Sequence, residues 1–343
     1  MRYIGIDLHT NSFTVCYLES GKPEKIQTLP VQKGGLEEFI KTLRSEDEVA
    51  LEATGNSVWF RKQVLPHVSR VVIIAPWQFE VIRRSVKKTD KHDARTIAFF
   101  LSKDMVPEAR LKTTEHTQLA SLIATRDQLV KLRVSLFNKV HGTFVRHGLK
   151  VKKETLTSKK GFERSVAKHQ WDTLEQIELE AIAGQLDSIK ESCRKLEQGI
   201  TEFAKKLPCY DNIISIKGIG PLSAAVFLCT IGDIDDFAKC GNLAAYFGIT
   251  PRVSQSNDSQ RVGRITKRSN KIARTTLVQC TLIAKRYSPY LHEFYEHIKS
   301  TRGAGKAIIA TARKLLNTIF HTLKNKWVFE DFTKFQFKSC NQS

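Results

Sequence analysis

Short apolar segments alternate with amphipathic ones through the N-terminal third of the chain. The short segments have the length and composition of β-strands, with turn residues between the first three: 3–8, 13–18, 25–30, 48–55 and 70–76. Residues 34–43 and 56–67 have the apolar spacing of amphipathic helices. A three-strand meander followed by β-α-β-α alternation predicts an α/β domain, in which a mixed sheet is covered by helices.

The middle of the chain has a different apolar period. Apolar residues recur at three- and four-residue steps through 119–140 and again through 174–200, and Pro208 ends the second stretch. A lysine-rich linker, 150–160, separates them. The pattern predicts either a coiled-coil-like arm for dimerisation or nucleic-acid binding, or an ordinary helical hairpin packed on its own domain.

A glycine-containing turn opens the last third of the chain. Residues 213–225 read as an apolar helix, a Gly-Ile-Gly turn and a helix of small residues, which resembles a helix-hairpin-helix. In that motif, backbone N–H groups approach a phosphate, so Lys217, Gly218 and Gly220 are candidate nucleic-acid-binding residues. A tight helix corner without a ligand is the alternative. Three nearby acids suggest a second metal site, but solvated turn residues are the favoured interpretation: Asp233, Asp235 and Asp236.

A hydroxyl-rich loop, 246–260, precedes a basic run. The pattern is typical of phosphate-backbone binding, and the candidate residues are Arg252, Arg261, Arg264, Lys267, Arg268 and Lys271. It also suits a serine nucleophile, because arginines stabilise the charge that develops on an attacked phosphate.

Composition narrows the class of partner. The net charge of +20 at pH 7 must lie on the surface, where it attracts polyanions, and nucleic acid fits better than a membrane. A hydrophobic content of 41% over 343 residues indicates a globular protein of two or three domains. We see neither a signal peptide nor an apolar run of membrane-spanning length. The seven scattered cysteines lack metal-ligand spacing and indicate reduced thiols in a cytoplasmic protein.

Two carboxylates interrupt the basic segment 87–95. Asp90 is placed like an N-cap, and Asp93 lies on the same face of the helix that follows. Two like charges in one place are costly unless a cation lies between them, so a hard divalent metal is the natural partner. The alternative is that Asp90 caps the helix and Asp93 pairs with nearby lysines.

Asp7 and Glu52 lie near the C-terminal ends of predicted strands, where open sheets place their chemistry. The fold therefore brings four carboxylates within reach of one site.

The three segments that contain these four carboxylates resemble the Asp-Glu-Asp-Asp signature of one transposase family. They are Ile4–Asp7, Leu51–Gly55 and Lys88–Arg95. The family comprises insertion-sequence recombinases with a RuvC-like, RNase H-like domain, also described as bridge-RNA-guided recombinases. Residues 248–252, followed by Ser256, resemble its C-terminal domain, in which one serine is the nucleophile, and the basic helix 305–324 resembles its end. The family places glycine after that serine, whereas this chain has Asn257 and Asp258. Ser254 and Ser259 therefore stay open as alternatives.

The resemblance implies a domain order and a reaction. Residues 1–108 would form the RNase H-like domain, with Mg²⁺, or Mn²⁺ as the alternative, on Asp7, Glu52, Asp90 and Asp93. A mainly helical region, 109–205, would lead to a transposase domain, 206–326, with Ser256 and the helix-hairpin-helix-like element, and then to a tail, 327–343. The implied reaction is strand cleavage through a covalent phosphoserine, followed by exchange and rejoining. Dimers would pair into tetramers, and a structured non-coding guide RNA would choose donor and target DNA in a bacterial or archaeal nucleoid.

Two other classes of protein stay open. A non-catalytic nucleic-acid-binding protein explains the positive charge, but it does not explain four carboxylates at equivalent fold positions; a metal titration distinguishes the two. Actin-like kinases and ATPases also begin with a strand, an Asp and a hairpin. They need glycine-rich phosphate loops, and the turn 9–12 has no glycine.

Overall fold

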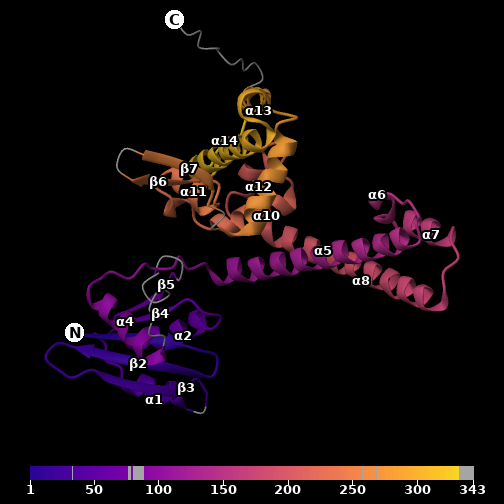
Figure 1. Ribbon diagram of the computed structural model, residues 1–343. Helices are drawn as coiled ribbons and strands as arrows, with labels where there is room; N and C mark the ends of the chain where they lie inside the picture. The colour runs from indigo at the N-terminus through magenta and orange to yellow at the C-terminus, as the bar shows by residue number, and fades with distance from the viewer. Residues whose placement is uncertain (33, 76–78, 80–88, 257–258, 267–268, 332–343) are drawn as a thin grey trace, which may run out of the picture. The chain divides into compact units, whose positions relative to one another are not determined.

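The computed structural model describes residues 1–32, 34–75, 79, 89–256, 259–266 and 269–331, with the backbone alone for those of 253–262. The chain divides into two compact units, Met1–Leu111 and Lys112–Ser343 (Figure 1). Each unit is built around its own apolar core.

The first unit contains a five-stranded mixed sheet in the order β3-β2-β1-β4-β5. β1 pairs antiparallel with β2 and parallel with β4, β2 pairs antiparallel with β3, and β4 pairs parallel with β5. The predicted mixed sheet is therefore confirmed. The strands are β1 (Arg2–Leu8), β2 (Ser12–Glu19), β3 (Lys25–Pro30), β4 (Glu48–Glu52) and β5 (Arg70–Ile74).

Helices cover both faces of this sheet. The helices are α1 (Gly35–Lys41), α2 (Ser57–Val64), the 3-10 turn η1 (Leu65–His67) and α4 (Asp90–Ser102). Ile4, Ile6 and Leu8 of β1 are buried in one apolar cluster with Phe39 of α1 and Phe60 of α2. Because side chains alternate along a strand, the odd-numbered positions of β1 face the other way. α4 packs on that second face.

Gly5 sets how closely α4 approaches the sheet. A Cβ atom at Gly5 would collide with the backbone of Ala94 and Ala98 in α4. Since backbone atoms cannot swing aside as a side chain does, glycine is required here. The close contact holds α4 against β1, and Asp7 lies two residues beyond Gly5 on the same face of that strand.

We expect Gly5→Ala to destabilise the first unit by about 1–3 kcal/mol or more, the usual cost of overpacking a core. Denaturant unfolding followed by circular dichroism measures the change. Gly55→Ala is the matched control, because a Cβ atom at Gly55 would meet nothing within 4 Å. Equal stability of the two variants would contradict the requirement for a close helix–sheet contact.

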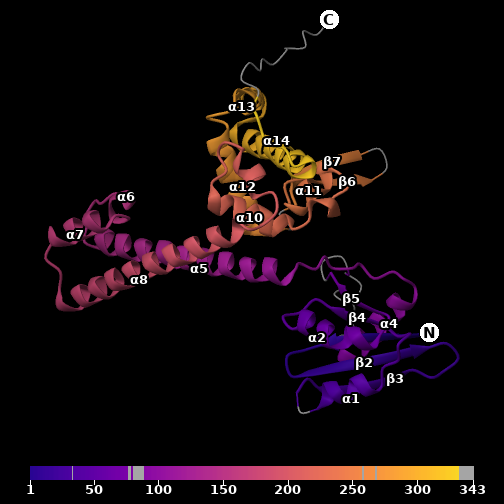
Figure 2. The same cartoon turned by 180° about the vertical axis from the view of Figure 1, so that it is seen from behind.

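The second unit begins with a helical hairpin. α5 (Thr114–Arg146) and α8 (Thr173–Ala204) pack along each other, with α6 (Lys153–Leu156) and α7 (Lys159–Ala167) at the end where they are joined (Figure 2). Val140 and Phe144 of α5 share an apolar cluster with Leu179 and Ile182 of α8. The predicted long helices are thus present, and their apolar faces contact each other within one chain.

The remainder of the second unit is a helical bundle with one β-hairpin. Its elements are α9 (Tyr210–Ile214), α10 (Pro221–Ile231), the 3-10 turn η2 (Ile234–Asp236), α11 (Cys240–Tyr246), β6 (Pro251–Ser256), β7 (Ser259–Ile265), α12 (Lys271–Ala284), α13 (Pro289–Arg302) and α14 (Ala304–Asn325). Phe227, Leu277 and Leu315 are fully buried in its core. None of the described helices has both the length and the apolar composition needed to cross a lipid bilayer.

The hydroxyl-rich loop predicted at 246–260 is largely a β-hairpin instead. β6 and β7 pair antiparallel, and the register ends with Ser256 opposite Ser259. The two intervening residues in the sequence, Asn257 and Asp258, are of the types that favour two-residue hairpin turns. This turn signal favours two paired strands over a hydroxyl-rich loop. Asn257 and Asp258 themselves lie outside the described residues.

Candidate active site

The ends of β1 and β4 bring two predicted carboxylates to one edge of the sheet. The strands run parallel with Ile6 opposite Leu51, and Asp7 and Glu52 are the next residues along each strand. Ala50, two residues before Glu52, is buried in the cluster under α4. Because strand side chains alternate between faces, Glu52 and Asp7 both belong to the face that α4 covers.

The first turn of α4 supplies the other two carboxylates. Thr89, rather than Asp90, is the N-cap, and its Oγ1 accepts a hydrogen bond from the backbone N–H of His92 at 3.3 Å. Placing Asp90 at the cap was therefore wrong: threonine also caps helices well, and it takes the position here. Asp90 and Asp93 thus lie inside the first turn, where the positive end of the helix dipole favours negative charge. Lys87 and Lys88 lie outside the described residues.

His9 joins Asp7 and Asp90 in a compact group. Its Nε2 lies 3.3 Å from Asp7 Oδ2 and 3.6 Å from Asp90 Oδ1. Potential metal-ligand atoms of these three side chains all lie within 4.8 Å of one another. Among the described residues, this is the group of three or more His, Cys, Asp or Glu side chains that meets this distance. Asp93 is close enough to Asp7 to raise its pKa, and Glu52 lies at the end of the neighbouring strand, but neither belongs to the group.

The β1–β2 turn that carries His9 is held from another element. Asn56, the N-cap residue of α2, donates an Nδ2 hydrogen bond to the backbone carbonyl of His9 at 3.1 Å. Thr54 Oγ1 in turn donates to Asn56 Oδ1 at 3.0 Å. The sequence analysis did not select His9. Its position two residues after Asp7, at the end of the same strand, is the signal that would have selected it.

Electrostatics favour a cation at this group. Burial raises the pKa of the Asp7 carboxyl, the nearby Asp90 and Asp93 carboxylates raise it further, and His9 opposes the shift. The charged form of Asp7 is therefore disfavoured without a counter-ion. Carboxylate oxygens are the ligands that Mg²⁺ and Mn²⁺ prefer, and imidazole is a ligand for many transition metals. The donor set fits a divalent cation.

The hairpin of the second unit carries the candidate nucleophile. Ser256 is the last residue of β6 and pairs with Ser259, and Ser254 pairs with Arg261. All three candidate serines are thus in the two paired strands near the hairpin's turn. The register gives their order along the hairpin, and the choice of Ser256 among them stays a prediction.

The predicted phosphate-binding residues are spread over three elements of the second unit. Arg252 and Arg264 are exposed on the hairpin, and Lys271 is exposed at the start of α12. Lys267 and Arg268 lie outside the described residues. Exposed cations on neighbouring segments fit contact with a phosphate backbone.

The Gly-Ile-Gly turn has a packing role. Gly218 has φ +100°, and a Cβ atom there would lie 2.6–2.7 Å from the backbone of Ala284 in α12. Packing therefore explains this glycine without a phosphate. Gly220 caps α10 and is exposed, as is Lys217, so a phosphate contact at these two residues stays a prediction.

The acidic turn at 233–236 has internal partners. Asp235 forms an ion pair with Lys324 of α14 at 2.5 Å. Asp233 Oδ1 accepts a hydrogen bond from the backbone N–H of Asp235 at 2.9 Å. These contacts agree with the favoured interpretation of the acids as turn residues.

Two family models match the chain. Residues 4–148 match a model described as a transposase, and residues 210–296 match a model described as the transposase IS116/IS110/IS902 family. The first range contains Asp7, Glu52, Asp90 and Asp93, and the second contains Ser256.

Several relatives are similar over most of the chain. A probable family 20 transposase of Pseudomonas aeruginosa is 27% identical over 243 residues, which cover 67% of this chain and 69% of the relative. The transposase for insertion sequence element IS1111A of Coxiella burnetii is 25% identical over 92% of this chain and 87% of its own length. The pilin gene-inverting protein of Moraxella bovis is 24% identical over 96% of this chain and 97% of its own length.

Proposed function

Because the chain belongs to the IS116/IS110/IS902 family of transposases, we propose that it cleaves and rejoins DNA strands with a divalent metal at its carboxylates and Ser256 as the nucleophile. The protein is a DNA transposase or recombinase, and DNA is its partner. The observation that carries the metal assignment is the convergence of Asp7, His9 and Asp90 at the end of β1.

The carboxylates would hold Mg²⁺, with Asp7 and Asp90 as direct ligands and Glu52 and Asp93 completing the acidic surroundings. When bound, the metal supplies charge that polarises a phosphodiester and neutralises the leaving oxygen. The half-buried Asp7 is fixed by β1, whereas Asp90 is more exposed, with 57% of its side chain accessible against 16% for Asp7. Asp7 therefore anchors the site, and Asp90 faces the incoming strand.

His9 positions the two carboxylates. Its Nε2 lies within reach of both carboxylates, and the hydrogen bond from Asn56 holds the turn that carries it. Its imidazole would offer the metal a third donor atom beside the two carboxylates.

Ser256 would attack the phosphorus of one DNA phosphodiester. The Oγ–phosphorus bond forms as the bond to the leaving strand's oxygen breaks; the serine hydroxyl loses its proton and the leaving oxygen gains one. Attack by an exchanged strand end reverses these steps and frees the serine. A serine hydroxyl needs help from a base, a metal or strong positive charge, and the hairpin's sequence between 246 and 266 contains no histidine.

We infer from this a composite site. The carboxylates belong to the first unit and Ser256 to the second, so activation of the serine would wait for DNA and partner subunits to assemble them. The family resemblance supports a dimer that pairs into a tetramer and a guide RNA that selects the two DNA sites. The exposed cations near the hairpin would hold the phosphate backbone without reading sequence.

Metal removal tests the proposed reaction. We expect DNA strand cleavage in Mg²⁺, comparable or slower cleavage in Mn²⁺, and loss of cleavage in EDTA that returns when Mg²⁺ is restored. Gel analysis of an end-labelled DNA substrate measures this. Undiminished cleavage in EDTA would refute a metal-dependent reaction.

A further inference from the structure

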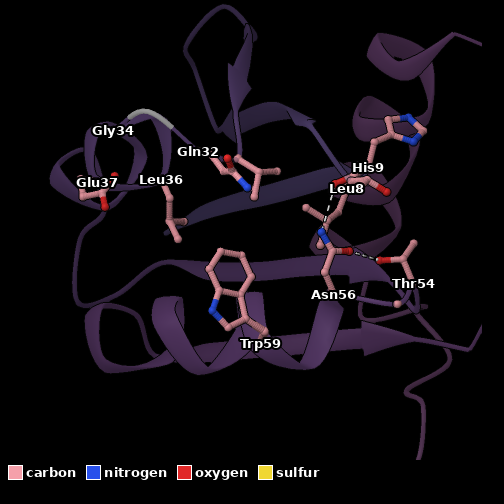
Figure 3. Close-up of a pocket in the computed structure, with 12 residues that line it drawn as sticks. Leu8, His9, Gln32, Gly34, Leu36, Glu37, Thr54, Asn56 and Trp59 are labelled. Atoms are coloured by element: carbon pink, nitrogen blue, oxygen red, sulfur yellow. Dashed lines mark hydrogen bonds between the residues drawn. The ribbon is translucent and has the colours of Figure 1, made fainter.

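A cavity of about 710 Å³ lies between the β1–β2 turn, α1 and α2 (Figure 3). Its size falls in the range of small-ligand pockets. His9 lines this cavity and is also the residue that contacts Asp7 and Asp90. The cavity lies on the α1 and α2 side of the sheet and the carboxylates on the α4 side, and His9, in the turn at the end of β1, borders both.

The described residues of the walls do not favour a phosphate. Among the described residues that line the cavity, none is a lysine or an arginine, and Glu37 adds a carboxylate. A free nucleotide, whose phosphates need positive charge or a glycine-rich loop, is disfavoured for the same reason.

The walls suit a neutral aromatic ring with polar edges. Trp59 is 44% exposed, and Figure 3 shows it across the cavity from Gln32. Leu8 and Leu36 supply apolar surface. Within the described part of the chain, no hydrogen bond engages the Gln32 amide or the Glu37 carboxylate, whereas Asn56 is occupied by His9 and Thr54. An exposed indole, a donor–acceptor amide and an acceptor carboxylate are what a nucleobase requires.

We propose that this cavity binds one unpaired base of the DNA strand whose phosphate lies at the carboxylates, with the base stacked on Trp59 and its edge toward Gln32 and Glu37. The proposal rests on the proposed function, which places a DNA strand at the carboxylates. An extruded base next to the reacting phosphate would fix the strand's position along the site. The base must be unpaired, because stacking on the indole replaces stacking within the duplex.

The test compares DNA binding with and without bases. The probes are an oligothymidylate and a strand of equal length made only of abasic nucleotides, and binding is measured by fluorescence anisotropy on protein carrying Asp90→Asn, without metal. We expect Trp59→Ala to weaken oligothymidylate binding roughly 5- to 100-fold, the range for one lost stacking contact, and to leave binding of the abasic strand unchanged. Trp59→Phe should recover most of the loss.

Val58→Ala is the matched control, since Val58 is the neighbouring residue of α2, is 59% exposed and does not line the cavity. It should bind both strands as the parent does. If Trp59→Ala itself unfolds, Gln32→Ala tests the same cavity with the same pair of strands. Equal losses on both strands, or no loss on either, would overturn the proposal. Because no cleavage is measured, failure here is distinct from failure of the proposed reaction.

Discussion

Replacing Asp90 by asparagine is expected to lower the rate of DNA strand cleavage at least ~1,000-fold, while binding to DNA persists. The substitution keeps the shape of the side chain and removes a charge that a divalent cation needs. A metal that stabilises the transition state by several kcal/mol accounts for a loss of this size. Single-turnover cleavage of a labelled substrate measures the rate, and anisotropy measures binding.

A matched charge removal elsewhere in the first unit gives the control for Asp90→Asn. Asp104 is on the surface, 82% exposed, and its φ of 51° is one that asparagine tolerates. Asp104→Asn should cleave at the wild-type rate, because an exposed ion pair such as that with Arg70 contributes little. Mg²⁺ should also raise the melting temperature of the wild type and of Asp104→Asn more than that of Asp90→Asn, since a ligand stabilises only the state that binds it. Wild-type cleavage by Asp90→Asn would refute the metal assignment.

Ser256→Ala is expected to lower the rate of strand cleavage by roughly 10⁴-fold or more and to leave DNA binding intact. Removing the attacking group of a covalent mechanism has an effect of this order in a well-studied serine enzyme. The rate is measured with pre-assembled protein–DNA complexes, so that assembly does not limit it.

The neighbouring serines provide the controls for Ser256→Ala. Ser254→Ala and Ser259→Ala remove the same hydroxyl from the same hairpin and should keep cleavage within a few-fold of the wild type. A full loss in Ser254→Ala or Ser259→Ala, with activity retained by Ser256→Ala, would reassign the nucleophile.

The first unit's sheet could be predicted because its signals are local. Each strand is a short apolar segment between turn residues, and the parallel arrangement follows from the intervening helices. The same reasoning placed Asp7 and Glu52 at strand ends, and the register puts them side by side. The α4 segment was also recognised, since Ala94, Ile97 and Leu101 recur at helical spacing and are buried.

The N-cap of α4, the position of His9 and the role of Gly5 could not be predicted from the sequence. They depend on a choice between two residues of similar propensity or on contacts between residues far apart in the chain. Thr89 and Asp90 are both good capping residues, and only the three-dimensional path of the chain decides between them. His9 enters the site through a hydrogen bond to Asn56, 47 residues away. Gly5 acts through contact with α4, which no local pattern reveals. These are tertiary contacts that one sequence does not encode in its periodicity.

The β-hairpin shows a different limit. The hydroxyl and basic residues of 246–264 indicate phosphate binding. The alternation of apolar and polar residues in this segment is too weak to indicate β-strands. The pairing of Val253 with Val262 and of Ser256 with Ser259 appears only in the structure. The sequence therefore predicts a loop at 246–260, where the structure has the paired strands β6 and β7.

The most direct measurement of the central claim is to trap the reaction on a suicide DNA substrate and identify the modified peptide by mass spectrometry. We predict a DNA adduct on Ser256 in the wild type with Mg²⁺, and none with EDTA, with Asp90→Asn or with Ser256→Ala. An adduct on Ser254, Ser259 or a tyrosine would contradict the assignment of the nucleophile. Complete cleavage without any protein–DNA adduct would contradict the covalent mechanism.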